Sequence, residues 1–246
     1  MSSFRRVFLA LAVGWVAGMA GAAEVAPNSL DEFAAYMFDA VGVRPRPCTA
    51  PDKMERRFCA GADSKAAKLK SAWDAGILAA GERWIVEPVT DWRSVKMLVW
   101  RYFVVDGKPI VVQANTKSHS LHIVGSGLPR CKTSLPEGII EIPGGEGERT
   151  PPELKYSTVY AWAFRAHRTG LDGKVRLIGT VSPKGHVQAL CLDSLEPPIV
   201  DLALSAMKSV RKWRFEPARI DDTPTAARVP FSFDLRPDEA QKVISF

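Results

Sequence analysis

Apolar residues follow a helical period near the start of the chain. They recur at intervals of three and four residues over Leu30–Val41, directly after the polar pair Asn28-Ser29. A polar N-cap, an apolar stripe and a following glycine are the start, body and stop signals of an amphipathic helix. The pattern therefore predicts a helix that stops near Gly42, and a second helix is expected over 62–75.

The pattern changes to two-residue alternation from Arg83 onward, which is typical of half-buried strands. Asp106-Gly107 stands between two such runs and is a strong hairpin signal. Strands are expected over residues 84–86, 95–105, 109–113 and 121–124. The first half of the chain is therefore predicted to be helices followed by an antiparallel sheet.

Turn-forming residues are concentrated between positions 134 and 153, where prolines and glycines alternate with charged residues. Such a stretch is typical of a domain boundary. We expect an α+β domain over 24–140, a Pro/Gly-rich linker over 141–153, a second domain over 154–238 and a tail over 239–246.

Residues 173–235 carry the most ordered pattern in the chain. A strand is expected over Val175–Val181, a turn over Ser182–Gly185, a strand over Val187–Leu192, a helix over Pro198–Val210 and a final strand over Arg228–Leu235. A further helix over Tyr156–His167, which would end at Thr169-Gly170, can form the start of this region.

The order and spacing of these elements resemble the TonB C-terminal domain family. The residues that carry the resemblance are Gly173, Gly185, the run Trp213, Arg214, Phe215, Pro217 and Ala218, and the closing Phe233-Asp234-Leu235. The resemblance implies an α+β domain with two helices packed on a three-stranded antiparallel sheet. Gly173, Gly185 and the Trp-Arg-Phe-x-Pro-Ala run are then structural residues, with Trp213 and Phe215 in the core.

The resemblance also implies a way of binding partners, in which an extended peptide adds to the edge of the sheet. The binding strand would comprise Arg228, Val229, Phe231, Ser232, Phe233, Asp234 and Leu235. Pro230 has no N–H, which suits an edge strand. The partner would be an envelope protein, such as an outer-membrane transporter, or a second copy of the chain. In the alternative, this strand only completes the core and residues 236–246 cap its edge.

The first 23 residues have the pattern of a secretory signal. Arg5-Arg6 form the positive end, Val7–Met19 the apolar core and Ala20–Ala23 the small residues of a cleavage site. We expect a periplasmic protein with no membrane span in the mature chain. The alternative is a conventional TonB-type energy transducer that retains this segment as its anchor.

Four cysteines, Cys48, Cys59, Cys131 and Cys191, follow the predicted signal. An even number in an oxidising compartment favours disulfides, and four cysteines allow three connectivities. Cys48 with Cys59 and Cys131 with Cys191 is the first choice, and free buried thiols are the alternative. Cys191 lies on the opposite strand face from its leucine neighbours, so it could meet a segment packed on the outer side of the sheet.

Composition and motifs give little sign of other chemistry. The formal charge of +6 is a mild excess without a basic, aromatic-rich run, so nucleic-acid binding is not expected. Gly144–Gly147 lacks the lysine of a P-loop, and His119 and His122 point to opposite faces of a strand. We expect no cofactor, no metal and no enzyme activity. The alternative is an enzyme whose site is a polar pocket within the first domain.

Overall fold

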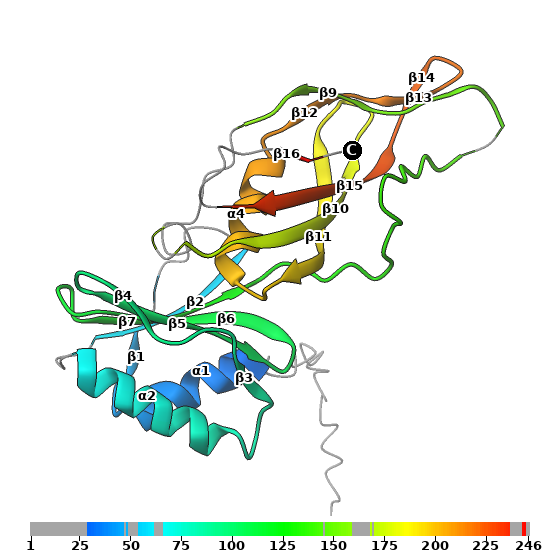
Figure 1. Ribbon diagram of the computed structural model, residues 1–246. Helices are drawn as coiled ribbons and strands as arrows, with labels where there is room; N and C mark the ends of the chain where they lie inside the picture. Colours follow the sequence, from blue (N-terminus) through cyan, green and yellow to red (C-terminus); the bar gives the residue numbers. More distant parts are fainter. Residues whose placement is uncertain are drawn as a thin grey trace, which may run out of the picture.

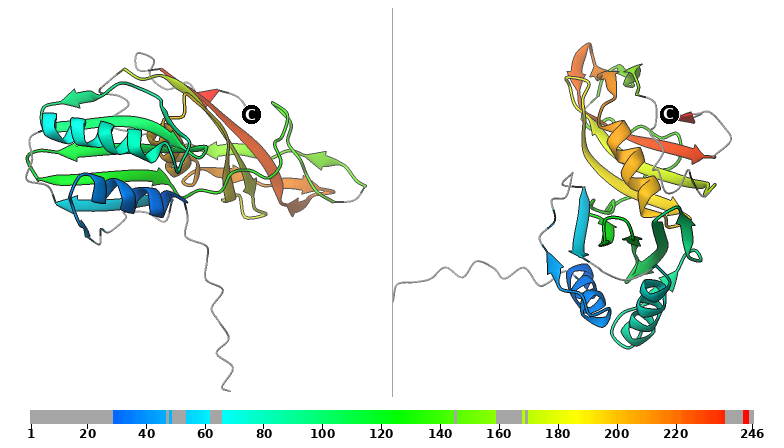
Figure 2. Two further views of the ribbon diagram at one scale, coloured as in Figure 1. Left: turned by 90° about the horizontal axis from the view of Figure 1, so that it is seen from below. Right: turned by 90° about the vertical axis from the view of Figure 1, so that its left-hand side faces the viewer.

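The computed structural model describes residues 29–46, 48, 54–61, 66–144, 146–158, 168, 170–236 and 243–244. The predicted signal over 1–23 and most of the helix predicted over 156–167 lie outside these residues. The described parts form four layers, and the right-hand view of Figure 2 shows them in order. Two helices cover one sheet, a third helix lies on the other face of that sheet, and a second sheet covers this third helix (Figure 1).

The outer helical layer consists of α1 (Ser29–Ala40) and α2 (Ala66–Ala80). Both predicted helices are therefore present, with α2 ending later than expected. Asp31 and Glu32 in the first turn of α1 suit the positive end of the helix dipole. Phe38 and Trp73 pack edge to face at 6.0 Å between the two helices. This layer buries one face of the first sheet.

The front sheet is antiparallel and has the order β1-β2-β7-β6-β5-β3, with β4 also paired to β5. Its strands are β1 (Pro45–Arg46), β2 (Glu55–Gly61), β3 (Val86–Pro88), β4 (Arg93–Val95), β5 (Leu98–Val105), β6 (Lys108–Asn115) and β7 (Ser120–Ser126). The single strand predicted over 95–105 is wrong, because a turn at Lys96, with φ of 54°, separates β4 from β5. Strand β2 was not predicted because its sequence lacks apolar alternation.

The back sheet has the order β11-β10-β15-β16. Its strands are β10 (Gly173–Val181), β11 (Val187–Glu196), β15 (Ala227–Leu235) and β16 (Val243–Ile244). The three predicted strands and the α+β class with antiparallel sheets are confirmed, and the chain's own tail adds the short β16. Strands β10 and β15 pair without interruption from Gly173↔Leu235 to Val181↔Ala227.

Short antiparallel strands outside the two main sheets form two further small sheets. Strand β9 (Glu153–Tyr156) pairs with β12 (Arg214–Glu216), and β13 (Ala218–Ile220) pairs with both β14 (Thr223–Thr225) and β8 (Arg149–Thr150). Tyr156 ends a strand, so the helix predicted from this residue does not begin there. Its remaining residues from 159 to 167 lie outside the described part of the chain.

Helix α4 (Val200–Val210) joins the two halves of the molecule. Nine of its eleven residues are buried, which is the pattern of a helix covered on more than one side. Trp100, Tyr102, Val111 and Val124 of the front sheet belong to the same hydrophobic cluster as the back sheet and α4. The two halves therefore share one core.

A buried hydrogen bond fixes the position of α4 against the front sheet. The Tyr102 hydroxyl on β5 donates to the Asp201 carboxylate in the first turn of α4, at 2.6 Å. Asp201 is 5% exposed. A buried carboxylate requires such donors, so this contact sets where the helix meets the sheet.

Candidate partner-binding edge

The hairpin turn between β10 and β11 holds the Trp-Arg-Phe run in place. Gly185 has a φ of 74°, and a Cβ there would overlap the Phe215 carbonyl oxygen. The Phe215 N–H donates to the Gly185 carbonyl at 2.9 Å, and the Gly185 N–H donates to Ser182 at 2.8 Å. Only glycine permits both the left-handed backbone and this close approach.

Trp213 is the centre of the aromatic core below β15. It is fully buried, and its ring lies 5.9 Å from Phe231 and 5.8 Å from Phe233. The indole N–H donates to the Thr158 carbonyl at 3.3 Å, and Phe215 packs on Phe231 at 6.1 Å. The aromatic residues of the family signature therefore anchor the strand that was predicted to bind partners.

The other signature residues lie around this core. Gly173 starts β10, and a Cβ there would lie 2.7 Å from a methyl carbon of Leu202, so glycine allows α4 to pack closely. Ala218 is fully buried, and Pro217 is partly buried. Arg214 is exposed and donates to the Trp213 carbonyl at 2.8 Å.

Strand β15 has one buried and one partly exposed face. Val229, Phe231, Phe233 and Leu235 are at most 4% exposed and face the aromatic core. The side chains of Arg228, Ser232 and Asp234 alternate with them and are partly exposed. A partner would therefore meet mainly the backbone of this strand and its polar face.

The backbone of β15 alternates between two neighbours. Arg228 exchanges both backbone hydrogen bonds with Glu141, at 3.0 and 2.8 Å. In an antiparallel strand every second residue points its N–H and C=O to the same side. Positions 228, 230, 232 and 234 therefore direct their backbone groups away from β10, and Pro230 has no donor on this outer edge.

Two segments of the chain lie along this outer edge. Glu141 pairs with Arg228 through its backbone and through an ion pair of 2.6 Å. Strand β16 pairs with Ser232 and Phe233 only. Within the part of the chain that the structure describes, pairing on this edge is thus confined to three residues of β15, while the binding role of the strand stays a prediction.

A segment that we call the strap, residues 129–141, connects the two edges of the back sheet. It begins on β11, where the Leu192 N–H donates to the Pro129 carbonyl at 3.1 Å and the Cys131 N–H donates to the Leu192 carbonyl at 3.0 Å. The Cys131–Cys191 disulfide closes this contact. The predicted pairings Cys131–Cys191 and Cys48–Cys59 are both confirmed.

The strap then crosses the face of the back sheet that α4 does not cover. Arg176 on β10 donates to the Leu135 carbonyl and forms an ion pair of 3.2 Å with Asp193. Ser134 donates to the same Asp193 carboxylate at 2.9 Å. Polar contacts hold the strap here, and Leu135 of the strap and Ile178 of β10 are both buried.

An ion-pair cluster stabilises the ribbon formed by β9 and β12. Lys155 and Arg219 both contact the Glu216 carboxylate. The hydrogen bond from Lys155, followed by that from Arg219, lowers the pKa of Glu216 below its ordinary value. Glu216 is thus held ionised beside the signature residue Phe215.

Two features are absent from the described residues, a cluster of metal ligands and a membrane-spanning helix. They contain no group of three His, Cys, Asp or Glu side chains placed to hold a metal ion. His119 occupies a turn with φ of 49°, and His122 follows on β7. No helix in the described ranges has the length and apolar character needed to cross a bilayer.

Comparison with known proteins finds a similarity in part of the second half of the chain. The family model described as "Gram-negative bacterial TonB protein C-terminal" matches residues 163–235. The match supports a TonB C-terminal family segment over these residues, which make up less than half of the chain. The matched segment spans β10, β11, α4 and β15, including the whole Trp-Arg-Phe run.

A solution NMR structure of the Pseudomonas aeruginosa TonB C-terminal domain is also similar, at 18% identity and a TM-score of 0.31. The alignment covers 37% of this chain and 92% of that one. None of the curated protein sequences compared with the chain matches it.

The sequence did not predict the contacts at the outer edge of β15. Glu141 lies in the stretch expected to be a linker, and Val243–Ile244 lies in the expected tail. One signal did point to the strap: Cys191 was expected to face a segment on the outer side of the sheet, and Cys131 brings the strap to that position.

Proposed function

We propose that the protein is exported to the periplasm and binds a cell-envelope protein by strand addition to the outer edge of β15. The observation that carries this proposal is the position of β16. Two residues of the chain's own tail pair antiparallel with Ser232 and Phe233, so this edge has the geometry to accept an added strand. An extended partner segment would use the same backbone groups.

A partner would replace β16 rather than bind beside it. The two described residues of the tail make two residue pairs with β15, whereas β10 makes nine on the other side. A longer partner strand could also reach Asp234, which no described strand faces on this edge. Each added pair brings backbone hydrogen bonds worth about 0.5–1.5 kcal/mol each, so a longer strand can outcompete the tail.

The residues of β15 have two roles in this proposal. Val229, Phe231, Phe233 and Leu235 hold the strand in place by burial. Ser232 and Asp234 present outward backbone groups and a polar face to the partner. Arg228 contributes less, because Glu141 already uses its backbone and its guanidinium.

The partner class is an envelope protein, with an outer-membrane transporter or a second copy of this chain as candidates. Sequencing of the native N-terminus after fractionation tests the export step. A start at Ala23 or Glu24 in the soluble periplasmic fraction supports the proposal. A start at Met1 in the inner membrane would favour an anchored energy transducer instead.

The binding experiment removes one backbone donor. Ser232→Pro deletes an N–H that points outward, and Pro230 shows that this strand accommodates proline in the same orientation. The matched control Ser232→Ala changes the side chain and keeps the N–H. A photo-crosslinking residue at Asp234, in the native host envelope, reports partner contact in each background.

We expect a discrete crosslinked adduct with Ser232→Ala and its loss with Ser232→Pro. Mass spectrometry of the adduct then distinguishes an envelope protein from a second copy of the chain. Equal adduct in both variants would contradict pairing at this edge. Circular dichroism melts of the two variants show whether Ser232→Pro remains folded.

A further inference from the structure

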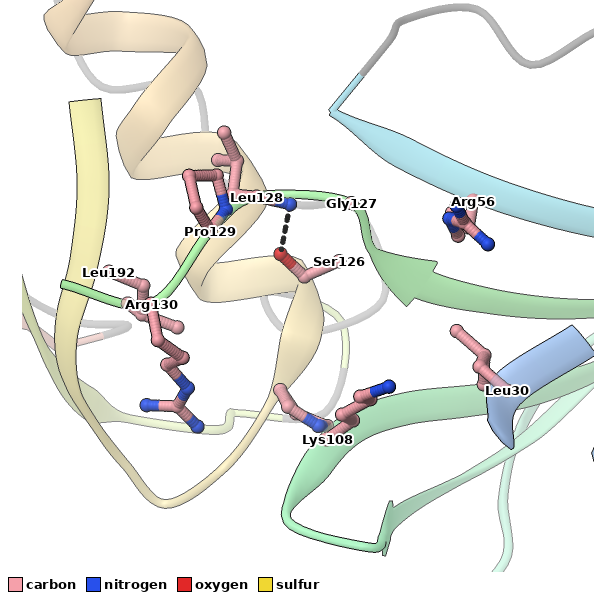
Figure 3. Close-up of a pocket in the computed structure, with 10 residues that line it drawn as sticks. Leu30, Arg56, Lys108, Ser126, Gly127, Leu128, Pro129, Arg130 and Leu192 are labelled. Atoms are coloured by element: carbon pink, nitrogen blue, oxygen red, sulfur yellow. Dashed lines mark hydrogen bonds between the residues drawn. The ribbon is translucent and has the colours of Figure 1, made fainter. Parts of the chain in front are cut away.

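The first half of the strap is firmly attached to the back sheet. Arg130 forms an isolated parallel bridge with Leu192 of β11, and Figure 3 shows the two residues side by side. The disulfide between Cys131 and Cys191 follows directly, and Leu135 is 6% exposed. Covalent, backbone and apolar contacts therefore all keep this half of the strap on the sheet.

The second half of the strap, residues 136–141, has little burial. Five of its six residues are exposed, and Ile140 packs on the core with only part of its surface. Beyond it, Arg149 holds the chain again by donating to the carbonyls of Ile142 and Gly144 at 3.1 and 2.8 Å. A segment with few buried apolar contacts opens locally at a lower free energy than the whole fold. Residues 136–141 can therefore leave the sheet between two points that stay attached.

Glu141 is the residue that closes this segment onto β15. Its backbone exchanges two hydrogen bonds with Arg228, at 3.0 and 2.8 Å, and its carboxylate forms an ion pair of 2.6 Å with the Arg228 guanidinium. The guanidinium also donates to the Thr133 carbonyl at 3.0 Å, in the attached half of the strap. Arg228 thus keeps one contact with the strap when Glu141 leaves, and its outward backbone groups become open to another strand.

We propose that Glu141 is an autoinhibitory contact, which must leave Arg228 before a partner strand can pair along the full outer edge of β15. This regulation rests on the strand addition proposed above. With Glu141 in place, the strap occupies position 228, and a partner is confined to the part of the edge beyond Pro230. With Glu141 released, position 228 can also pair. Because strap and partner use the same backbone groups, the apparent affinity is reduced by the fraction of molecules that are open.

The backbone bonds of Glu141 matter more than its charge. The ion pair is exposed, with the Glu141 side chain at 49% and the Arg228 side chain at 32%. An exposed ion pair shifts an equilibrium by no more than about fivefold. One backbone hydrogen bond shifts it by about two- to tenfold. Removing both should therefore open the segment clearly more than removing the charge alone.

Two substitutions separate these contributions. Glu141→Ala removes the ion pair and keeps the backbone bonds, whereas Glu141→Pro also removes the N–H that donates to the Arg228 carbonyl.

The matched controls are Glu137→Ala and Glu137→Pro, at an exposed glutamate of the same segment. Glu137 lies in a turn closed by the Ile139 N–H, which donates to the Pro136 carbonyl at 3.3 Å, and the next residue, Gly138, has a φ of 71°. A turn of this kind accepts proline at the position of Glu137. These controls thus introduce the same substitutions without removing the contact with Arg228.

Hydrogen exchange followed by NMR on the purified full chain measures the opening. The Arg228 amide donates to the Glu141 carbonyl, so its exchange rate reports release of this contact. We expect exchange to be faster by up to about fivefold in Glu141→Ala and by about tenfold or more in Glu141→Pro. The Phe231 amide, which faces β10, is the internal reference and should not change. Unchanged exchange at Arg228 in both Glu141 variants would overturn the proposal.

Photo-crosslinking from position 234 in the native host envelope measures the effect on binding. The yield of adduct should rise in Glu141→Ala, rise further in Glu141→Pro and stay at the wild-type level in both Glu137 variants. Thermal melts show whether Glu141→Pro remains folded, and Glu141→Ala tests the same contact if it does not.

The outcomes separate this regulation from the strand addition itself. An adduct that is lost with Ser232→Pro but equal in the Glu141 and Glu137 variants would overturn autoinhibition and leave the binding edge in place. Absence of any adduct in every background would overturn the binding edge, and the regulation would fall with it.

Discussion

The front and back sheets of this protein are covered in different ways. Helices cover the front sheet on both faces, with α1 and α2 on one side and α4 on the other. The back sheet shares α4 but has the strap on its outer face, held by a disulfide and by the Arg176–Asp193 ion pair. Hydrophobic burial therefore dominates in the front sheet, whereas covalent and polar contacts matter more on the outer face of the back sheet.

This difference indicates which sheet can open at its edge without unfolding the rest of the molecule. Opening the front sheet would expose large apolar side chains such as Trp73 and Phe103. Opening the outer edge of the back sheet exposes backbone groups and partly exposed polar side chains. The back sheet is thus the place where an added strand costs the least in lost burial.

The largest effect is expected from truncating a buried tryptophan. This change tests whether the two halves of the molecule share one core. Trp213→Ala and, in the other cluster, Trp73→Ala should each lower the free energy of unfolding by about 3–5 kcal/mol, the usual cost of deleting a buried tryptophan. Urea denaturation followed by far-UV circular dichroism should show one transition in both variants. Two separate transitions would contradict the shared core around α4.

The next largest effect is expected from removing each of the two disulfides in turn. Replacing both Cys131 and Cys191 by serine should cost about 4 kcal/mol, and the same change at Cys48 and Cys59 about 3 kcal/mol, by the loop-entropy relation. The order follows from loop sizes, with separations of 60 and 11 residues. Denaturation of both double variants measures the free energy of unfolding that each loses. A reversed order would show that the strap adds little to stability.

A smaller effect is expected at the contact between β5 and α4. Tyr102→Phe removes the hydroxyl that donates to the buried Asp201 carboxylate. Loss of a donor to a buried group should lower the free energy of unfolding by about 1–3 kcal/mol. Tyr156→Phe is the matched control, because Tyr156 is 58% exposed, and it should leave stability unchanged in the same denaturation measurement.

The smallest expected effect is a pH dependence at Glu216. Lys155 and Arg219 lower its folded pKa, so the ionised carboxylate stabilises the fold. This contribution is present above the ordinary carboxyl pKa and is lost as the pH falls through the lowered value. The melting temperatures of the wild type and Glu216→Gln should therefore converge at acid pH, whereas a constant difference would rule out this linkage.

The order of elements between Gly173 and Leu235 could be predicted from the sequence. Alternation predicted β10, β11 and β15, and helical spacing predicted α4, because each element buries one continuous apolar face. The turn at Lys96 could not be predicted, since Val95 and Met97 continue an apolar run and lysine is not a usual turn residue. The local pattern there does not reveal the left-handed backbone.

Contacts made by polar or very short segments could not be predicted either. Glu141 meets Arg228 as one isolated residue pair, and β16 is two residues long, so neither leaves a periodic pattern. Strands that are far apart in the sequence, such as β2 and β7, are brought together only by the strand order of the front sheet. Pairing between distant strands depends on topology, which the order of elements alone does not determine.

Pro230 has a consequence for aggregation. Exposed strand edges invite the stacking of identical molecules, because each added strand offers a new edge to the next. At Pro230 the outer edge of β15 offers a carbonyl but no N–H, so a strand laid along its whole length misses one bond at the centre. A short segment that stays between Ser232 and Leu235 avoids this gap. The missing donor at Pro230 therefore opposes the stacking of identical molecules along this edge.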